Sequence, residues 1–231
     1  MYDAARFTNW LTNGQGSGGT ETGVYNLASL LTGGSLPADH SYLVGTGTKW
    51  FLPTEDEWYK AAYYKGGGTN AGYWKYPFQS DTQPTFNQTP GDSNSANVYN
   101  GVLAVTQLGS WSYVNNQNYL TDVGAYTSAL SPYGSFDMGG DVFQWNETSM
   151  FISGRGFGSG ERGGSWDIFS TALGSTYRNN DDPTLEASSV GFRVAELPEP
   201  GTLTLFVIGA AGFLAWAWRR SRSRCLVSRC P

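Results

Sequence analysis

The sequence has very little sulfur and almost no histidine. Its two cysteines, Cys225 and Cys230, lie in the last seven residues, and its single histidine is His40. A disulfide framework and a cysteine-based metal site are therefore excluded for the rest of the chain. One imidazole cannot build a histidine metal site, and His40 lies in a Gly/Ser-rich stretch, so we interpret it as a solvated loop residue.

Charged residues are also scarce, at 14% of the chain, and the formal net charge is −5. No basic stripe precedes Arg219, so we expect no nucleic-acid partner. Glycine (31 copies), tryptophan (9) and tyrosine (14) are abundant instead. This balance favours an irregular, turn-rich domain packed with aromatic side chains over a helical bundle or a disordered chain. A length of 231 residues favours one domain plus a tail.

Two helices are predicted from apolar spacing. Near the start, Ala4, Phe7, Trp10 and Leu11 recur at steps of three and four residues, which predicts one buried helix face. The residues ahead of this helix do not form the charged and apolar regions of a signal peptide.

The second helix is predicted over 55–64. Thr54 is followed three residues later by Glu57, the pattern of a capping box, with acidic residues in the first turn. We expect Trp58, Ala61 and Ala62 to face the core.

A strand is predicted at the end of the domain. Residues 191–194 (Gly-Phe-Arg-Val) alternate, so Phe192 and Val194 are expected to face inward while Arg193 faces a partner or water. The Asn/Asp-rich run at 177–183 is expected to form a loop. Within it, Asp181 and Asp182 precede a proline, which is more typical of a turn than of acid–base catalysis.

Three blocks carry a resemblance to a known family. They are Leu-Pro-Thr-Glu-Asp-Glu-Trp at 52–58, Gly-Ser-Phe-Asp-Met-Gly-Gly-Asp-Val-Phe-Gln-Trp at 134–145, and Arg-Gly-Gly-Ser-Trp at 162–166 followed by Gly-Phe-Arg at 191–193. Together they resemble the sulfatase-modifying factor (formylglycine-generating enzyme) family. The resemblance implies an α+β, irregular and loop-rich fold of the C-type-lectin-like kind over residues 1–196. The first helix usually lies well inside that fold, so the resemblance also implies a domain truncated at its N-terminus.

The resemblance implies a chemistry that this chain lacks the residues for. Formylglycine-generating enzymes oxidise a sulfatase cysteine with two active-site cysteines that hold copper(I). The corresponding positions here are approximately Ser170 and Ser175, and serine hydroxyls do not replace soft thiolate ligands. We therefore expect neither copper nor the family's own reaction. Iron-dependent sulfoxide synthases of the same fold group use three histidines, which this chain does not have.

Calcium is the better-supported ion. The family binds calcium through an Asn and a Glu in the second block, where this chain has Asp141 and Gln144. One carboxylate and one amide oxygen are retained, and hard oxygen ligands suit calcium. The alternative is that Asp141 only completes a turn after two glycines. A second family calcium site uses the Asn of an Ala-Asn pair, which corresponds to Asn97.

The tail from 197 to 224 has a different composition. Pro198, Glu199 and Pro200 precede an uncharged apolar run at 202–218, and an arginine cluster beginning with Arg219 and Arg220 follows. The apolar run is long enough to cross a bilayer as one transmembrane helix, with the arginines on the cytoplasmic side.

The tail resembles a PEP-CTERM sorting signal. Such signals imply an exported bacterial protein of the cell membrane, cell surface or extracellular matrix, processed by an exosortase-type enzyme. Residues 225–231 form a short tail that the resemblance does not explain.

Two functions remain open, besides a non-functional fragment. The first is a surface-sorted binding or scaffold protein whose ligand is a surface polymer or another protein. The second is an oxidoreductase of this family with a site built from other residues. Five loop aromatics are candidate ligand contacts, with core packing as the alternative for each: Trp74, Tyr76, Tyr99, Trp111 and Tyr113.

Overall fold

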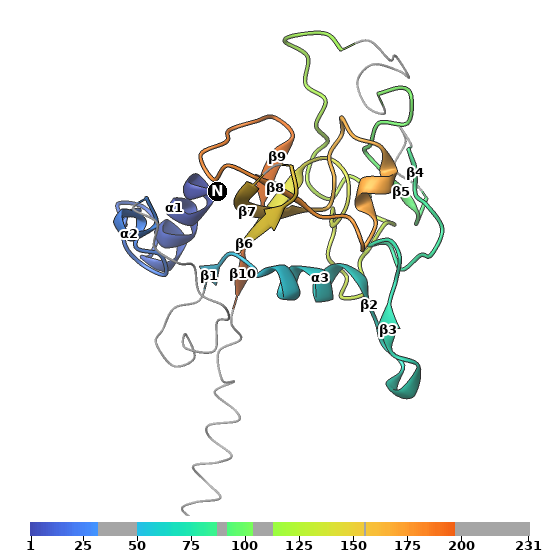
Figure 1. Ribbon diagram of the computed structural model, residues 1–231, viewed down its shortest axis with the longest axis horizontal. Coiled ribbons are helices and arrows are strands. Elements are labelled where there is room, and N and C mark those ends of the chain that lie inside the picture. Colours follow the sequence, from blue (N-terminus) through green and yellow to red (C-terminus); the bar gives the residue numbers. More distant parts are fainter. Residues whose placement is uncertain (32–49, 87–91, 104–112, 155, 197–231) are drawn as a thin grey trace, which may run out of the picture. The chain divides into compact units, whose positions relative to one another are not determined.

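The computed structural model describes residues 1–31, 50–86, 92–103, 113–154 and 156–196 (Figure 1). The chain divides into two compact units, Met1–Ala195 and Glu196–Pro231. His40, Trp111 and the residues of the predicted sorting signal lie outside the described residues. The described part is a mixture of short helices and strands joined by long loops, which confirms the expected α+β, loop-rich class.

Three α-helices and two 3-10 turns lie in the described part. The helices are α1 (Tyr2–Thr12), α2 (Leu27–Leu31) and α3 (Glu55–Tyr63), and the 3-10 turns are η2 (Gly68–Asn70) and η3 (Ser170–Leu173).

The capping box predicted for α3 is present. The Glu57 backbone N–H donates to Thr54 Oγ1 at 3.2 Å, and the Thr54 N–H donates to Glu57 Oε2 at 2.9 Å. Trp58 and Ala62 are buried as expected, and Ala61 is half-buried.

The buried face of α1 differs from the predicted one. Ala4, Ala5, Thr8 and Asn9 are buried, whereas Phe7 is 42% exposed. The polar residues are buried because the fold satisfies them. Thr8 Oγ1 donates to the Ala4 carbonyl, while the Asn9 amide donates to the carbonyls of Thr20 and Tyr25 and accepts from the Tyr25 N–H. Hydrophobic spacing cannot detect a face held by side-chain hydrogen bonds.

A four-stranded sheet carries most of the long-range pairing. Its strands are β6 (Phe143–Ile152), β7 (Gly156–Arg162), β8 (Asn179–Asp181) and β9 (Val190–Phe192), in the order β8-β7-β6-β9. The pairs β6–β7 and β7–β8 are antiparallel, and β6–β9 is parallel. Figure 1 shows these yellow and orange strands lying together, with α3 in cyan beside them.

The remaining strands have two residues each. They are β1 (Trp50–Phe51), β2 (Tyr64–Lys65), β3 (Gly72–Tyr73), β4 (Thr85–Phe86), β5 (Ser95–Ala96) and β10 (Ala195–Glu196). Strands β2 and β3 pair antiparallel, and β4 and β5 pair parallel.

Two sequence predictions at the end of the domain are wrong. The middle of the expected Asn/Asp loop forms strand β8, because the buried Asn180 amide donates to the carbonyls of Met150 and Gly156 and so ties this segment to the β6–β7 hairpin. Phe192 is 38% exposed instead of buried, and its ring packs edge-on against Phe7 at 5.4 Å. The expected turn is present at Asp182, whose Oδ1 accepts from the N–H and hydroxyl of Thr184.

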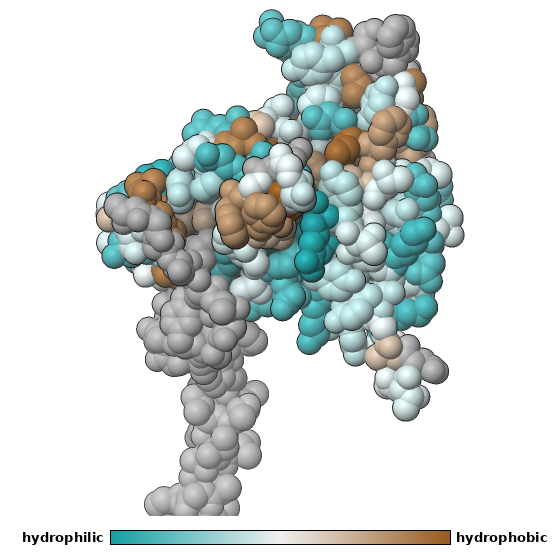
Figure 2. Space-filling model, in the orientation of Figure 1, coloured by the Kyte–Doolittle hydropathy of each residue, from teal (hydrophilic) through white to brown (hydrophobic). Residues whose placement is uncertain are grey.

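The apolar interior is divided into several clusters. One joins α1, α2 and Trp145, a second surrounds Tyr76 and Leu173, and a third surrounds Trp58. On the face in Figure 2, brown apolar residues form small separate patches among teal and white ones, as is usual for a protein surface. Within the described residues, no helix is both long and apolar enough to cross a membrane; the predicted span at 202–218 lies outside them.

Candidate functional site

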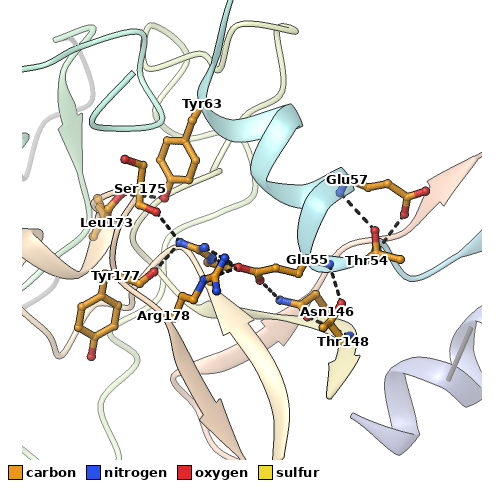
Figure 3. A network of polar contacts seen from close by, with 11 residues as sticks. Thr54, Glu55, Glu57, Tyr63, Asn146, Thr148, Leu173, Ser175, Tyr177 and Arg178 are labelled. Carbon is orange, nitrogen blue, oxygen red and sulfur yellow. Dashed lines mark hydrogen bonds and ion pairs between the residues drawn. The ribbon is translucent and has the colours of Figure 1, made fainter. Parts of the chain in front are cut away.

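A buried ion pair fixes the loop that forms the site. Glu55, in the first turn of α3, accepts at Oε1 from both Nε and Nη2 of Arg162, which ends β7. Its other oxygen accepts from Asn146 Nδ2 at 2.8 Å, and Arg178 Nε lies 3.2 Å from Oε1 (Figure 3). The sequence explained Glu55 by helix capping alone; the structure gives its side chain this second, larger role.

The same arginine holds the chain that follows η3. Arg162 Nη1 donates to the carbonyls of Ser175 and Tyr177, and the Tyr63 hydroxyl donates to the Leu173 carbonyl at 2.9 Å (Figure 3). Burial raises the pKa of Tyr63, which keeps this hydroxyl protonated. Helix α3, strand β7 and the loop at 173–178 are thereby joined into one rigid frame.

An aromatic cleft opens beside this frame. It has a volume of about 420 Å³ and is lined by Tyr99, Leu103, Tyr113, Trp166, Asp167 and Ser188. Trp166 is 6% exposed, and its ring stacks on Tyr119 with centroids 4.5 Å apart and planes 9° apart. Tyr113 stacks on Tyr119 at 5.3 Å and is itself 62% exposed, so it presents ring surface to solvent.

Backbone contacts hold the walls of the cleft in place. The Tyr99 N–H donates to the Ile168 carbonyl at 3.0 Å, and the Tyr99 ring packs on Phe169 at 5.1 Å. On the other wall, the Val114 N–H donates to the Tyr119 hydroxyl at 2.6 Å. These contacts hold both walls of the cleft in position.

A second hollow of about 220 Å³ adjoins the cleft at Asp167, which lines both. The residues that line it include Glu161, Asp181, Tyr177 and Asn179. The Ser165 hydroxyl donates to Asp167 Oδ1 at 2.5 Å and orients this carboxylate at the junction.

Two of the predicted calcium ligands meet beneath the aromatic stack. Asn97 Nδ2 donates to Asp141 Oδ1 and to the Tyr119 carbonyl, both at 2.8 Å. Asp141 Oδ1 also accepts from the N–H and hydroxyl of Thr121, and the Asp141 carbonyl accepts from the Trp166 N–H at 2.9 Å. This pair thus connects both partners of the Tyr119–Trp166 stack.

Gln144 is engaged elsewhere. Its Oε1 accepts from Trp58 Nε1 at 2.9 Å and from Arg193 Nε at 2.6 Å, and its Nε2 donates to the Asp137 carbonyl. A carbonyl oxygen that already faces a guanidinium does not fit a calcium ligand. Burial lowers the pKa of Arg193 and raises the pKa of Asp137, and each charge partly offsets the effect on the other.

The local backbone explains the glycines that precede Asp141. Gly140 has φ of +80°, and a Cβ there would lie 2.7 Å from the Asn97 carbonyl oxygen. Asp141 itself has φ of +64°. Only glycine fits at 140, because the backbone of this turn packs directly on Ala96, which ends β5, and on Asn97, which follows it.

The two serines predicted at the family's cysteine positions have structural contacts. Ser170 is buried at the start of η3, and its Oγ accepts from Gln83 Nε2 at 2.7 Å. Ser175 donates its N–H to the Lys75 carbonyl. Neither serine lines either hollow. Within the described residues, no group of three or more His, Cys, Asp or Glu side chains is arranged to hold a metal ion, and both cysteines and His40 lie outside that part.

The candidate aromatics separate into three groups. Tyr99 and Tyr113 line the cleft, whereas Tyr76 is buried in the core and Trp74 lies under Lys65 Nζ at 3.9 Å from the ring centroid. Trp166 was not among the candidate aromatics, because the sequence analysis used it only as part of the Arg-Gly-Gly-Ser-Trp block. The signal that was available is the polar Asp167 directly after a Gly-Gly-Ser-Trp run.

The family model described as "Sulfatase-modifying factor enzyme 1-like domain" matches residues 1–197. The chain belongs to this family. A second model, the PEP-CTERM protein-sorting motif, matches residues 196–221. The motif identifies an exported, surface-sorted protein that an exosortase-type enzyme recognises and processes.

Solved structures similar to the chain are distant. PvdO from Pseudomonas aeruginosa is 20% identical with a TM-score of 0.41, over 68% of this chain and 57% of that one. CarF is 22% identical with a TM-score of 0.40, over 64% of this chain and 48% of CarF. Treponema denticola variable protein 1 is 23% identical with a TM-score of 0.35, over 64% of this chain and 48% of that one. The chain therefore spans about half the length of these structures, and no curated protein matches it.

Proposed function

We propose that this surface-sorted protein is a binding protein whose ligand occupies the aromatic cleft. The observation that carries the proposal is the cleft of about 420 Å³ with Tyr99, Tyr113 and Trp166 in its lining. Aromatic rings supply large contact areas with few rotatable bonds, so they bind ligands at a low cost in entropy. The ligand is a polymer of the cell surface or another surface protein.

The competing function is the family's oxidation of a cysteine. It is disfavoured because Ser170 and Ser175 have hard hydroxyl oxygens and both cysteines of the chain lie after residue 224. Copper bound stoichiometrically by the purified protein, or formylglycine formed in a sulfatase peptide, would overturn the binding proposal in favour of this oxidase.

The tail anchors the protein before processing. In this proposal residues 202–218 span the membrane as a helix, Arg219 and Arg220 stay in the cytoplasm, and the sorting enzyme cuts near Pro198–Pro200. Protease protection of an epitope placed after Arg224, in inverted and right-side-out vesicles, tests this orientation.

We propose calcium binding only at Asn97 and Asp141. Their contact lies beneath the cleft, so a calcium ion there would brace the same Tyr119–Trp166 stack that the hydrogen bonds already hold. Gln144 is left out of this proposal because its oxygen contacts Arg193.

An array of bacterial surface polysaccharides and of peptides tests the binding proposal. We expect the detergent-solubilised full chain to bind at least one array feature and the Tyr113→Ala variant to lose about tenfold or more in affinity, as for a truncated aromatic contact. The matched control is Tyr133→Ala, which removes another exposed ring, 56% accessible, outside both hollows. Absence of binding to every feature, or equal binding by Tyr113→Ala, would contradict the proposal.

A further inference from the structure

The two hollows are lined by acidic residues as well as by aromatic rings. Asp167 is exposed and stands where the two hollows meet, and Glu161 and Asp181 line the second hollow. The described residues that line either hollow include no lysine, arginine or histidine. A ligand in the cleft therefore meets aromatic surface together with the exposed carboxylate of Asp167.

Two of the described arginines near the hollows have another acceptor. Both Arg162 and Arg178 contact Glu55, which lies on α3 and lines neither hollow.

We propose that the cleft selects a ligand that carries an ammonium group on an apolar stem, as a lysine side chain does. This inference rests on the proposed binding function of the cleft. The stem would lie against Tyr99, Tyr113 and Trp166, and the ammonium group would pair with Asp167 at the entrance to the second hollow. Aromatic faces and a carboxylate both attract a cation, whereas the same surroundings repel an anionic ligand.

The state of Asp167 favours an ammonium over a guanidinium group. Ser165 already donates to Oδ1, so a two-point guanidinium contact would compete with this hydroxyl for one oxygen. A single ammonium N–H can pair with Oδ2 while the Ser165 contact stays in place. The probe should therefore be a lysine derivative, with the arginine derivative as a weaker comparison.

The experiment titrates the detergent-solubilised full chain with Nα-acetyl-lysine methylamide and with the neutral Nα-acetyl-norleucine methylamide. We expect the lysine probe to bind about tenfold more tightly, the combined size of an exposed cation–π contact and an ion pair. Asp167→Asn should abolish this preference, and added salt should weaken only the lysine probe. The control Asp56→Asn removes another exposed carboxylate, on α3, that lines neither hollow, and should leave the preference intact.

The outcomes separate the inference from the function on which it rests. Equal binding of both probes with loss in Tyr113→Ala would overturn the ammonium inference and leave the binding cleft in place. Failure of the lysine probe to bind at all would also overturn it, and the array would then decide the cleft's function separately. Binding of 1,5-diaminopentane as tightly as the lysine probe would support a free amine as the source, and binding of the lysine probe alone would support a protein-borne side chain. Near-ultraviolet circular dichroism of Asp167→Asn confirms that the aromatic stack is intact.

Discussion

Arg162 and Glu55 form a two-point ion pair in the interior, where their side chains are 1% and 7% exposed. They are 107 positions apart in the sequence, so the pair joins the start of α3 to the end of β7. Because Arg162 also binds the carbonyls of Ser175 and Tyr177, one side chain fixes the loop that follows the cleft residues.

Replacing Arg162 by methionine should destabilise the domain by about 3 kcal/mol or more, because it leaves a buried carboxylate without its main partner. Urea unfolding followed by tryptophan fluorescence measures this loss. The control is Arg178→Met, because Arg178 is 59% accessible and lies 3.2 Å from the same carboxylate. This change should cost less than about 1 kcal/mol. Equal losses in the two variants would show that burial does not set the strength of the pair.

The capping box of α3 gives a second stability prediction. Thr54→Ala removes the oxygen that accepts from the Glu57 N–H and should cost about 1 kcal/mol, whereas Thr54→Ser keeps that oxygen and should stay close to the parent. Thermal unfolding of the three proteins checks this order. A melting temperature of Thr54→Ser as low as that of Thr54→Ala would mean that the methyl group, not the cap, is what stabilises this position.

Asp137 should make the stability depend on pH. Burial raises its pKa above the ordinary value of 3.8, so the folded protein holds this proton more tightly than the unfolded chain does. The resulting stabilisation is fully present below 3.8 and is lost as the pH rises through the folded-state pKa. Asp137→Asn removes the titration and still accepts the Gly124 N–H, and asparagine tolerates the φ of +53° at this position.

The measurement is the melting temperature of the parent and of Asp137→Asn from pH 3 to pH 7. The parent should lose stability relative to the variant as the pH rises above 3.8, and the difference should level off at higher pH. A difference that stays constant, or that changes in favour of the parent, would contradict the pKa direction.

The sequence predicted helix α3 correctly but did not predict strand β8. The capping box and apolar spacing placed α3 within one residue, because both signals are local. Strand β8 was expected to be a loop, because asparagine usually indicates a turn, and its strand is held by Asn180 contacts to residues 24 and 30 positions away. Phe192 was assigned to the core because alternation gives the two faces of a strand but not which of them the rest of the chain covers.

The candidate site was predictable only in part. Tyr99 and Tyr113 were among the expected ligand contacts, but no local pattern distinguished them from Tyr76, which is buried in the core. Trp166 joins them through its stack on Tyr119, a contact between segments 47 positions apart whose geometry depends on Asp141 and Asn97. Tertiary contacts assemble such a site, so composition alone shows which residue types are present but not how they are arranged.

Asp141 provides the last prediction, because its two interpretations give different results. As a hydrogen-bond acceptor it needs no metal: Asp141→Ala should lower the near-ultraviolet circular dichroism of the Tyr119–Trp166 stack, and calcium should change neither protein. If Asp141 is a calcium ligand together with Asn97, millimolar CaCl₂ should raise the melting temperature of the parent, since a ligand that binds only the folded state stabilises it. Asn97→Ala should lose that rise, whereas Gln144→Glu should keep it, because position 144 contacts Trp58 and Arg193 instead of the Asn97–Asp141 pair. A calcium-dependent rise that disappears on changing Gln144 but not Asn97 would place the ion at Gln144, against the contacts that its oxygen makes here.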